Sequence, residues 1–85
     1  DKQPLSLIDV REPSEFTKGS IPGAVNIPRG LLEFSIEENV KASDATVVLY
    51  CAGGGRSALA AKSLQDMGFS QVFSLQGGFG NWMVS

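Results

Sequence analysis

The fold is decided by one stretch, Thr46-Val47-Val48-Leu49-Tyr50-Cys51-Ala52-Gly53-Gly54-Gly55-Arg56-Ser57. Its first five residues form a mostly apolar, β-branched run, which is typical of a strand buried on both faces of a parallel sheet. A turn with three glycines follows. Residues 57–67 are rich in alanine, leucine, lysine and glutamine, so they predict a helix that Gly68 ends. A strand, a tight turn and a helix in immediate succession indicate an α/β fold.

The segments on either side repeat this alternation. We expect three further strands, at residues 5–10, 24–28 and 71–75. We also expect three further helices, at 13–18 after an early proline, at 29–36 and at 79–84. The polar residues 37–45 predict a surface connection, and residues 21–23 and 76–78 predict turns. The predicted fold class is therefore α/β, with a mostly parallel central sheet flanked by helices in three layers.

Two sets of residues are expected in the core. One is the inner side of the helix at 57–67, formed by Ala58, Leu59, Ala61, Leu64 and Met67. The other is a group of core aromatics, Phe73, Phe79 and Trp82.

Composition narrows the classes of function. The 85 residues predict a single domain over 1–85. A net charge of −2 without a basic block argues against a nucleic-acid partner. No apolar run approaches the roughly 20 residues of a membrane span, which argues against a membrane protein.

Cys51 is the only cysteine, and the chain has no histidine. The sequence therefore predicts no internal disulfide, no zinc site and no Cys–His catalytic pair. It predicts neither a metal nor a cofactor. A single thiol fits a reducing compartment, so a cytoplasmic location is expected. If this thiol is a nucleophile, something other than histidine must activate it.

The turn after Cys51 offers such activation. Three glycines let the backbone curl so that N–H groups face inward, and the next helix points its positive N-terminus at the same place. We expect an anion cradle of backbone N–H groups from Ala52, Gly53, Gly54, Gly55, Arg56 and Ser57. Such a cradle would lower the pKa of the Cys51 thiol. The alternatives are a buried, inert cysteine and a merely flexible turn.

Arg56 adds a fixed positive charge to this loop. It is expected to shape the loop by pairing with a carboxylate such as Asp9 or Glu15, more than to act in the chemistry directly. Arg29 and Lys18 are further cations that could attract anions. A phosphate-binding P-loop is disfavoured because Arg56-Ser57 stands where a Lys-Ser/Thr pair is needed and the spacing is too short, and no G-x-G-x-x-G is present.

Four segments together resemble the rhodanese-like domain family, and they cover nearly the whole chain. They are Leu7-Ile8-Asp9-Val10-Arg11-Glu12-Pro13-Ser14-Glu15-Phe16, Gly19-Ser20-Ile21-Pro22-Gly23-Ala24-Val25-Asn26-Ile27-Pro28, the loop from Cys51 to Ser57, and Gln76-Gly77-Gly78 with Trp82. Ser20 stands where the family usually has histidine. The chain begins at the first strand of the match, so a domain without the earlier strand and helix of many members is expected.

The resemblance implies a sulfurtransferase. Cys51 would take sulfur as a persulfide from a small anionic donor such as thiosulfate, and Cys51 and Arg56 are the expected catalytic residues. Cyanide, a cellular thiol or a partner protein would then accept the sulfur. Asp9 and Arg11 would support the strand ends as a buried hydrogen-bonded or ionic network.

Two alternative functions are also compatible with the sequence. One is a catalytically weak rhodanese-like binding or regulatory module, and the other is a phosphatase or arsenate reductase. The six residues from Cys51 to Arg56 match the sulfur-transferring members. The related phosphatases have a loop one residue longer, which disfavours the second reading.

Overall fold

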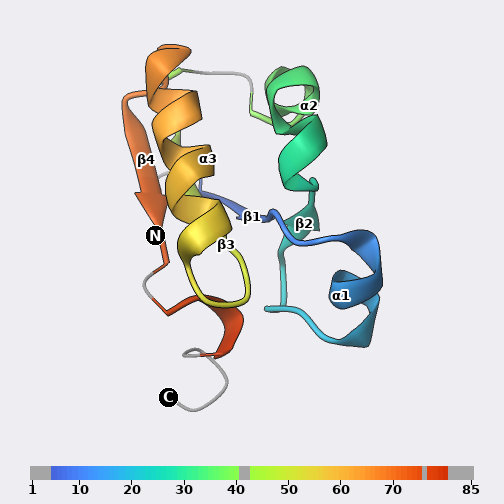
Figure 1. The fold of residues 1–85 in the computed structure, drawn as a ribbon. Helices are drawn as coiled ribbons and strands as arrows, with labels where there is room; N and C mark the ends of the chain where they lie inside the picture. The colour runs from blue at the N-terminus through green and yellow to red at the C-terminus, as the bar shows by residue number, and fades with distance from the viewer. Residues whose placement is uncertain (1–4, 41–42, 76, 81–85) are drawn as a thin grey trace.

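The computed structural model describes residues 5–40, 43–75 and 77–80, and it alternates strands with helices along the chain (Figure 1). The elements are, in order, β1 (Leu5–Asp9), α1 (Pro13–Lys18), β2 (Val25–Asn26), the 3₁₀ turn η1 (Arg29–Leu31), α2 (Leu32–Asn39), β3 (Thr46–Tyr50), α3 (Gly55–Asp66) and β4 (Gln71–Ser74). No helix among these residues is both long and apolar enough to cross a bilayer.

The four strands form one parallel sheet in the order β2-β1-β3-β4, which confirms the predicted α/β class. The register pairs Ile8 with Leu49, and Val47 with Val72. Because all strands run the same way, their carboxyl ends meet at one edge of the sheet. Cys51 follows β3 directly and therefore lies at that edge.

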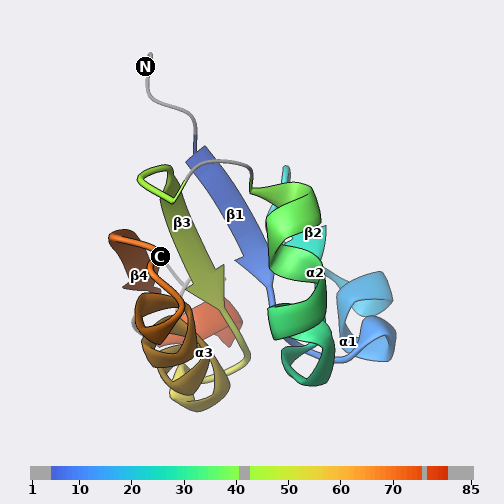
Figure 2. The ribbon, with the colours of Figure 1, turned by 90° about the horizontal axis from the view of Figure 1, so that it is seen from above.

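Helices α2 and α3 pack on the same face of the sheet and enclose the main core (Figure 2). This core contains strand residues such as Ile8, Val47 and Leu49, together with Leu32 and Leu64 from the helices. Alternation along each strand sends these side chains toward the helices and their neighbours to the opposite face.

The opposite face carries a row formed by Leu7, Val48 and Phe73, which the register places side by side. Phe73 is 53% exposed, so the prediction of a core aromatic at this position was wrong. The reason is its place on β4, where Val72 takes the inward position. Phe79 is half-buried and stacks on Tyr50 with ring centroids 6.3 Å apart. Trp82 lies outside the described residues.

Helix α3 begins two residues earlier than expected, at Gly55, because Gly54 adopts a left-handed conformation with φ of 107° at the N-cap. Its buried stripe has the helical spacing 57, 60, 61 and 64, so that Ser57 and Ala60 take inward positions beside Ala61 and Leu64. The prediction that Ala58, Leu59 and Met67 are buried was therefore wrong: all three are exposed, Leu59 by 67%.

The expected boundaries differ elsewhere by a few residues. The predicted helix at 29–36 is the 3₁₀ turn η1 followed by α2, which continues to Asn39. The surface connection is therefore shorter than the predicted 37–45. The expected strand at 24–28 is reduced to Val25–Asn26, although Ile27 still donates a backbone hydrogen bond to the Asp9 carbonyl at 3.0 Å.

Candidate functional site

Cys51 is 1% exposed and lies between the end of β3 and the start of α3 (Figure 1). Its sulfur accepts hydrogen bonds from the backbone N–H of Gly54, at 3.1 Å, and of Ser57, at 3.4 Å. Two N–H groups of the predicted cradle therefore converge on Sγ. The N–H groups of Ala52, Gly55 and Arg56 belong to the same loop, but they make no hydrogen bond to Sγ in the described part of the chain.

The Ser57 side chain adds a hydroxyl group to the surroundings of the sulfur. Its Oγ lies 3.7 Å from Cys51 Sγ, 3.2 Å from the Gly54 carbonyl oxygen and 2.7 Å from Ser74 Oγ. A hydroxyl can accept a hydrogen bond from a thiol or donate one to a thiolate. Ser57 can therefore serve both protonation states of Cys51, with Ser74 as the second partner of its oxygen.

Ser74 was not among the predicted site residues. It stands at the end of β4, and a serine at a strand end has no pattern that marks it. Only the parallel register, which places Ser74 beside Leu49, brings it near the loop. The end of a neighbouring strand was the one usable signal.

Two opposing effects set the pKa of the Cys51 thiol. Burial raises the pKa, whereas the N–H and hydroxyl of Ser57 and the N–H groups of Gly54 and Gly53 lower it, and the net result is a pKa below its ordinary value. The thiolate is therefore populated at lower pH than in a free cysteine.

The ultraviolet absorbance of the thiolate tests this balance. We expect the wild-type titration to have its midpoint below that of free cysteine. Ser57→Ala removes a donor to the thiolate, so its midpoint should move to higher pH. The matched control is Ser63→Ala, which removes a hydroxyl from the same helix where it bonds Glu33 instead. Equal midpoints for wild type and Ser57→Ala would show that the Ser57 hydroxyl does not lower the pKa of Cys51, and would leave the backbone N–H groups as the cause.

Arg56 pairs with Glu15 of α1 and not with Asp9. Its two terminal nitrogens donate to the two carboxylate oxygens of Glu15 at 3.0 and 3.2 Å. This bidentate pair lowers the pKa of Glu15 to about 2, with a smaller contribution from a backbone hydrogen bond at Glu12. Both side chains are partly exposed, so the pair lies at the rim of the loop.

Asp9 and Arg11 form a buried network at the carboxyl end of β1. Asp9 accepts hydrogen bonds from the Arg11 backbone N–H at 2.8 Å and from its guanidinium at 2.7 to 3.1 Å. Arg11 also donates to the Gly19 carbonyl at 2.6 Å, and its guanidinium carbon lies 4.4 Å from the Phe79 ring centroid. The network joins segments that are distant in the sequence. A buried hydrogen-bonded or ionic network is what was predicted for Asp9 and Arg11.

The segment at residues 77–80 fastens the loop from the other side. Phe79 N–H donates to the Cys51 carbonyl at 2.7 Å, and Gly80 N–H donates to the Ala52 carbonyl at 3.1 Å. Gly78 has φ of 60°, and a Cβ there would collide with the Cys51 carbonyl oxygen and lie 2.8 Å from that of Ala52. Only glycine allows this approach without displacing backbone.

Gly78→Ala should therefore lower the free energy of unfolding by about 1–3 kcal/mol, because the colliding atoms belong to backbone that cannot turn away. Urea unfolding measures the loss, and thiolate titration of the folded fraction reports any change at Cys51. Gly80→Ala is the control, since its Cβ would lie 3.5 Å from the Ala52 carbonyl oxygen in ordinary contact. Equal stability of the two variants would contradict the tight approach at Gly78.

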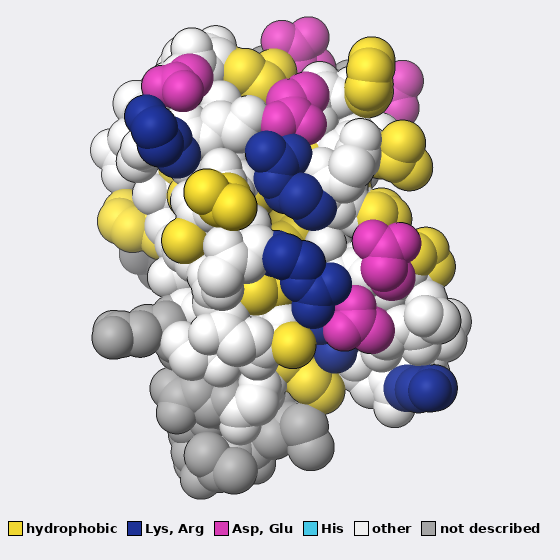
Figure 3. All heavy atoms as spheres, in the orientation of Figure 1, with side chains coloured by type: hydrophobic (Ala, Val, Ile, Leu, Met, Phe, Trp, Pro, Cys, Tyr) yellow, Lys and Arg dark blue, Asp and Glu magenta, His cyan; other side chains and the backbone are white. Residues whose placement is uncertain are grey.

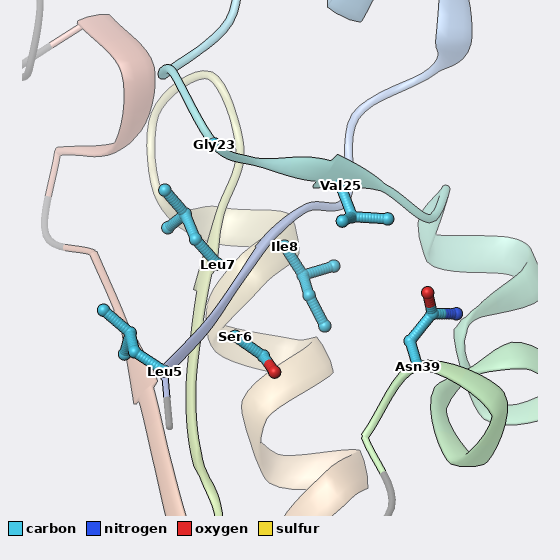
Figure 4. Close-up of a pocket in the computed structure, with 7 residues that line it drawn as sticks. All are labelled: Leu5, Ser6, Leu7, Ile8, Gly23, Val25 and Asn39. Carbon is cyan, nitrogen blue, oxygen red and sulfur yellow. The ribbon is translucent and has the colours of Figure 1, made fainter. Parts of the chain in front are cut away.

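A small pocket of about 140 Å³ lies along β1 and β2, apart from Cys51 (Figure 4). Its lining residues are Leu5, Ser6, Leu7, Ile8, Gly23, Val25 and Asn39. None of these side chains is ionisable. The chemistry of the described residues is therefore concentrated at the loop after β3 and not in this pocket.

Known proteins of similar sequence include two bacterial relatives. The chain is 45% identical over 76 residues to the uncharacterized protein YqhL of Bacillus subtilis, covering 89% of the chain and 59% of that protein. It is 37% identical over 82 residues to a protein named sulfurtransferase from Allochromatium vinosum, covering 96% of the chain and 75% of that protein. The chain thus spans only part of the length of these relatives.

Solved structures share the fold. A thiosulfate sulfurtransferase from Pseudomonas aeruginosa superimposes with a TM-score of 0.91 at 35% identity, covering 96% of this chain and 16% of that one. The Rhodopseudomonas palustris protein RPA3614, described as of unknown function and a possible tyrosine phosphatase, gives 0.85 at 43% identity, covering 94% of this chain and 66% of that one.

The family model for the rhodanese-like domain matches residues 1–85, which is the whole sequence. The match includes the loop at Cys51, the buried Asp9–Arg11 pair and the glycines at 77 and 78. With the parallel sheet and the sulfurtransferase-named relatives, it identifies the chain as a member of the rhodanese-like domain family.

Proposed function

We propose that this domain transfers sulfane sulfur through a persulfide on Cys51. The observation that carries the proposal is the surroundings of Sγ, where the N–H groups of Gly54 and Ser57 and the Ser57 hydroxyl converge on one buried sulfur. Such donors stabilise a thiolate, which is the reactive form of cysteine, without any histidine. Relatives named sulfurtransferase and thiosulfate sulfurtransferase support the same class of reaction.

The first step is an attack by the Cys51 thiolate on the outer sulfur of a donor. With thiosulfate, a bond forms between Sγ and this outer sulfur while the sulfur–sulfur bond of thiosulfate breaks. The electron pair of the broken bond leaves with sulfite. Charge is conserved, because a thiolate and a dianion become a persulfide anion and the sulfite dianion.

The second step returns the enzyme to its starting state. A nucleophilic acceptor such as cyanide or a thiol attacks the terminal sulfur of the persulfide, and the electron pair of the broken bond returns to Sγ. With cyanide the product is thiocyanate. The loop donors that hold the thiolate also stabilise the anion in this step, so one cradle serves both halves of the reaction.

Thiocyanate formation from thiosulfate and cyanide tests the proposal. The wild-type domain should produce thiocyanate in proportion to its concentration. Hydrolysis of an aryl phosphate ester without any thiocyanate would favour a phosphatase instead. Uptake of one sulfur without transfer to cyanide or thiols would favour a binding module.

A further inference from the structure

Arg56 is the arginine of the loop after Cys51, and its guanidinium is paired with the Glu15 carboxylate. The guanidinium makes two parallel hydrogen bonds to the Glu15 carboxylate, at 3.0 and 3.2 Å. The side chains are 40% and 35% exposed, so solvent reaches the pair. Solvent screens an exposed ion pair of this kind, so the pair is weaker than a buried one. A competing anion can therefore open it, but must displace a carboxylate.

The pKa of this guanidinium is raised by two groups. Glu15 makes the largest contribution to the raised pKa of Arg56, and the Cys51 sulfur makes a smaller contribution in the same direction. The charge of Arg56 is therefore coupled mainly to Glu15 and more weakly to Cys51. Because the pKa of Glu15 is about 2, its carboxylate is charged throughout the neutral range.

The other described arginines are also neutralised. Arg11 pairs with Asp9 at 2.7 Å, and Arg29 pairs with Glu33 at 2.9 Å. Figure 3 shows one face of the molecule, where several Lys and Arg side chains follow one another down the middle of the view, most of them beside Asp or Glu side chains. A dianion that approaches the loop finds no arginine among the described residues without a carboxylate partner.

The Glu15 carboxylate should therefore weaken the binding of a sulfur donor more when that donor carries more negative charge. Thiosulfate is a dianion, and it gains the Arg56 guanidinium only by displacing Glu15 or by accepting repulsion from it. An organic persulfide with a neutral organic part carries at most one negative charge, whereas thiosulfate carries two, so the persulfide depends less on the cation. The protonated persulfide is the form that reacts as a donor. In its reaction the Cys51 thiolate attacks the outer sulfur, the donor's sulfur–sulfur bond breaks, and the electron pair leaves on an organic thiolate. The proton remains on the transferred sulfur.

We propose that Glu15 is a positioning residue that selects the sulfur donor by charge, disfavouring dianionic thiosulfate relative to organic persulfides, which carry at most one negative charge. This inference rests on the proposed sulfur transfer at Cys51. Glu15 acts through the Arg56 guanidinium and need not touch the reacting atoms.

The test compares wild type with Glu15→Gln, using thiosulfate and the persulfide of 2-mercaptoethanol as donors. Rapid quenching and mass spectrometry give the rate of Cys51 persulfide formation without an acceptor. Glu15→Gln should lower the half-saturating thiosulfate concentration roughly three- to ten-fold, as expected for removal of one competing exposed charge. The half-saturating concentration of the less charged persulfide should change by about twofold or less. Glu15→Asp should retain wild-type behaviour.

Glu33→Gln is the matched control, because Glu33 pairs with Arg29 through a similar, partly exposed ion pair. It removes the same charge without freeing Arg56, so its thiosulfate value should stay near that of wild type. The half-saturating thiosulfate concentration of Glu15→Gln should also rise more steeply with ionic strength than that of wild type. The reason is that an exposed guanidinium then binds the donor, and salt screens this attraction.

Two outcomes would overturn the inference. One is a higher half-saturating thiosulfate concentration in Glu15→Gln, and the other is an equal loss of maximal rate with both donors, which would make Glu15 a structural brace. If Glu15→Gln does not fold, the wild-type protein decides: a half-saturating thiosulfate concentration at or below that of the less charged persulfide contradicts the proposal. Failure of the proposed function itself is distinct, since wild type would then form no persulfide with either donor.

Discussion

Cys51→Ser should reduce thiocyanate formation to the rate without protein. Serine keeps the size of the side chain and the hydrogen bonds from Gly54 and Ser57, but its hydroxyl is not ionised at neutral pH and cannot form a persulfide. Loss of a covalent nucleophile lowers kcat by roughly four orders of magnitude or more in enzymes where it has been measured. The assay is thiocyanate release at saturating thiosulfate.

The fold should survive this substitution. Cys51 is buried, and serine is only slightly smaller than cysteine, so the substitution should leave almost no cavity. Urea unfolding of Cys51→Ser within about 1.5 kcal/mol of wild type would show that loss of activity is chemical. Residual turnover well above background in a folded Cys51→Ser protein would contradict the proposed nucleophile, since the chain has no second cysteine to replace it.

Asp9→Ala should be the most destabilising of the substitutions considered. The Asp9 side chain is fully buried and the Arg11 side chain is 6% exposed, so removal of the carboxylate leaves a buried guanidinium without its counter-ion. Breaking such a pair costs about 3–5 kcal/mol. Since a small domain has only about 5–15 kcal/mol in total, a large part of the stability should be lost.

Urea unfolding monitored by circular dichroism measures this loss, and Asp66→Ala is the control. Asp66 pairs with Lys62 at 3.8 Å, and both side chains are at least 70% exposed. Its removal should change stability by less than about 0.5 kcal/mol. A loss below about 1 kcal/mol for Asp9→Ala would mean that the buried network does not hold the strand ends together. If Asp9→Ala does not fold, Asp9→Asn keeps the shape of the side chain and allows the comparison.

Local sequence signals were strong enough to predict most of the fold. The run at residues 46–50 and the short helix at 13–18 have the expected bounds, because an apolar β-branched strand and an early proline are local features. The parallel sheet followed from the alternation of strands with helices. Helix and strand boundaries were predicted less accurately where the conformation of a glycine determines them. At Gly54, a left-handed φ makes α3 begin earlier than predicted.

Burial on a single face was harder to predict. Leu59 was assigned to the core because it is apolar, yet it is 67% exposed, while the polar Ser57 is fully buried. The Ser57 hydroxyl is satisfied by the Gly54 carbonyl and by Ser74, and neither contact can be read from composition. Phe73 shows the same difficulty on β4, where register and not hydropathy decides which side faces the helices.

The candidate site was predictable in its centre and less so at its rim. Cys51 and the glycine turn were evident from residue types, and Glu15 was one of two partners considered for Arg56. The bonds from Phe79 and Gly80 to the loop carbonyls, and the place of Ser74, depend on contacts between distant segments. Such contacts require the folded arrangement of β3, β4 and the segment after it.

The most direct test of the central claim is the mass of the protein after exposure to a sulfur donor. The intact wild-type domain, incubated with thiosulfate or an organic persulfide and then freed of excess donor, should gain the mass of one sulfur atom. Peptide mapping should place this gain on Cys51, and cyanide should remove it with release of thiocyanate. Absence of the gain with every donor, in folded protein whose Cys51 reacts with a thiol reagent, would contradict the persulfide account.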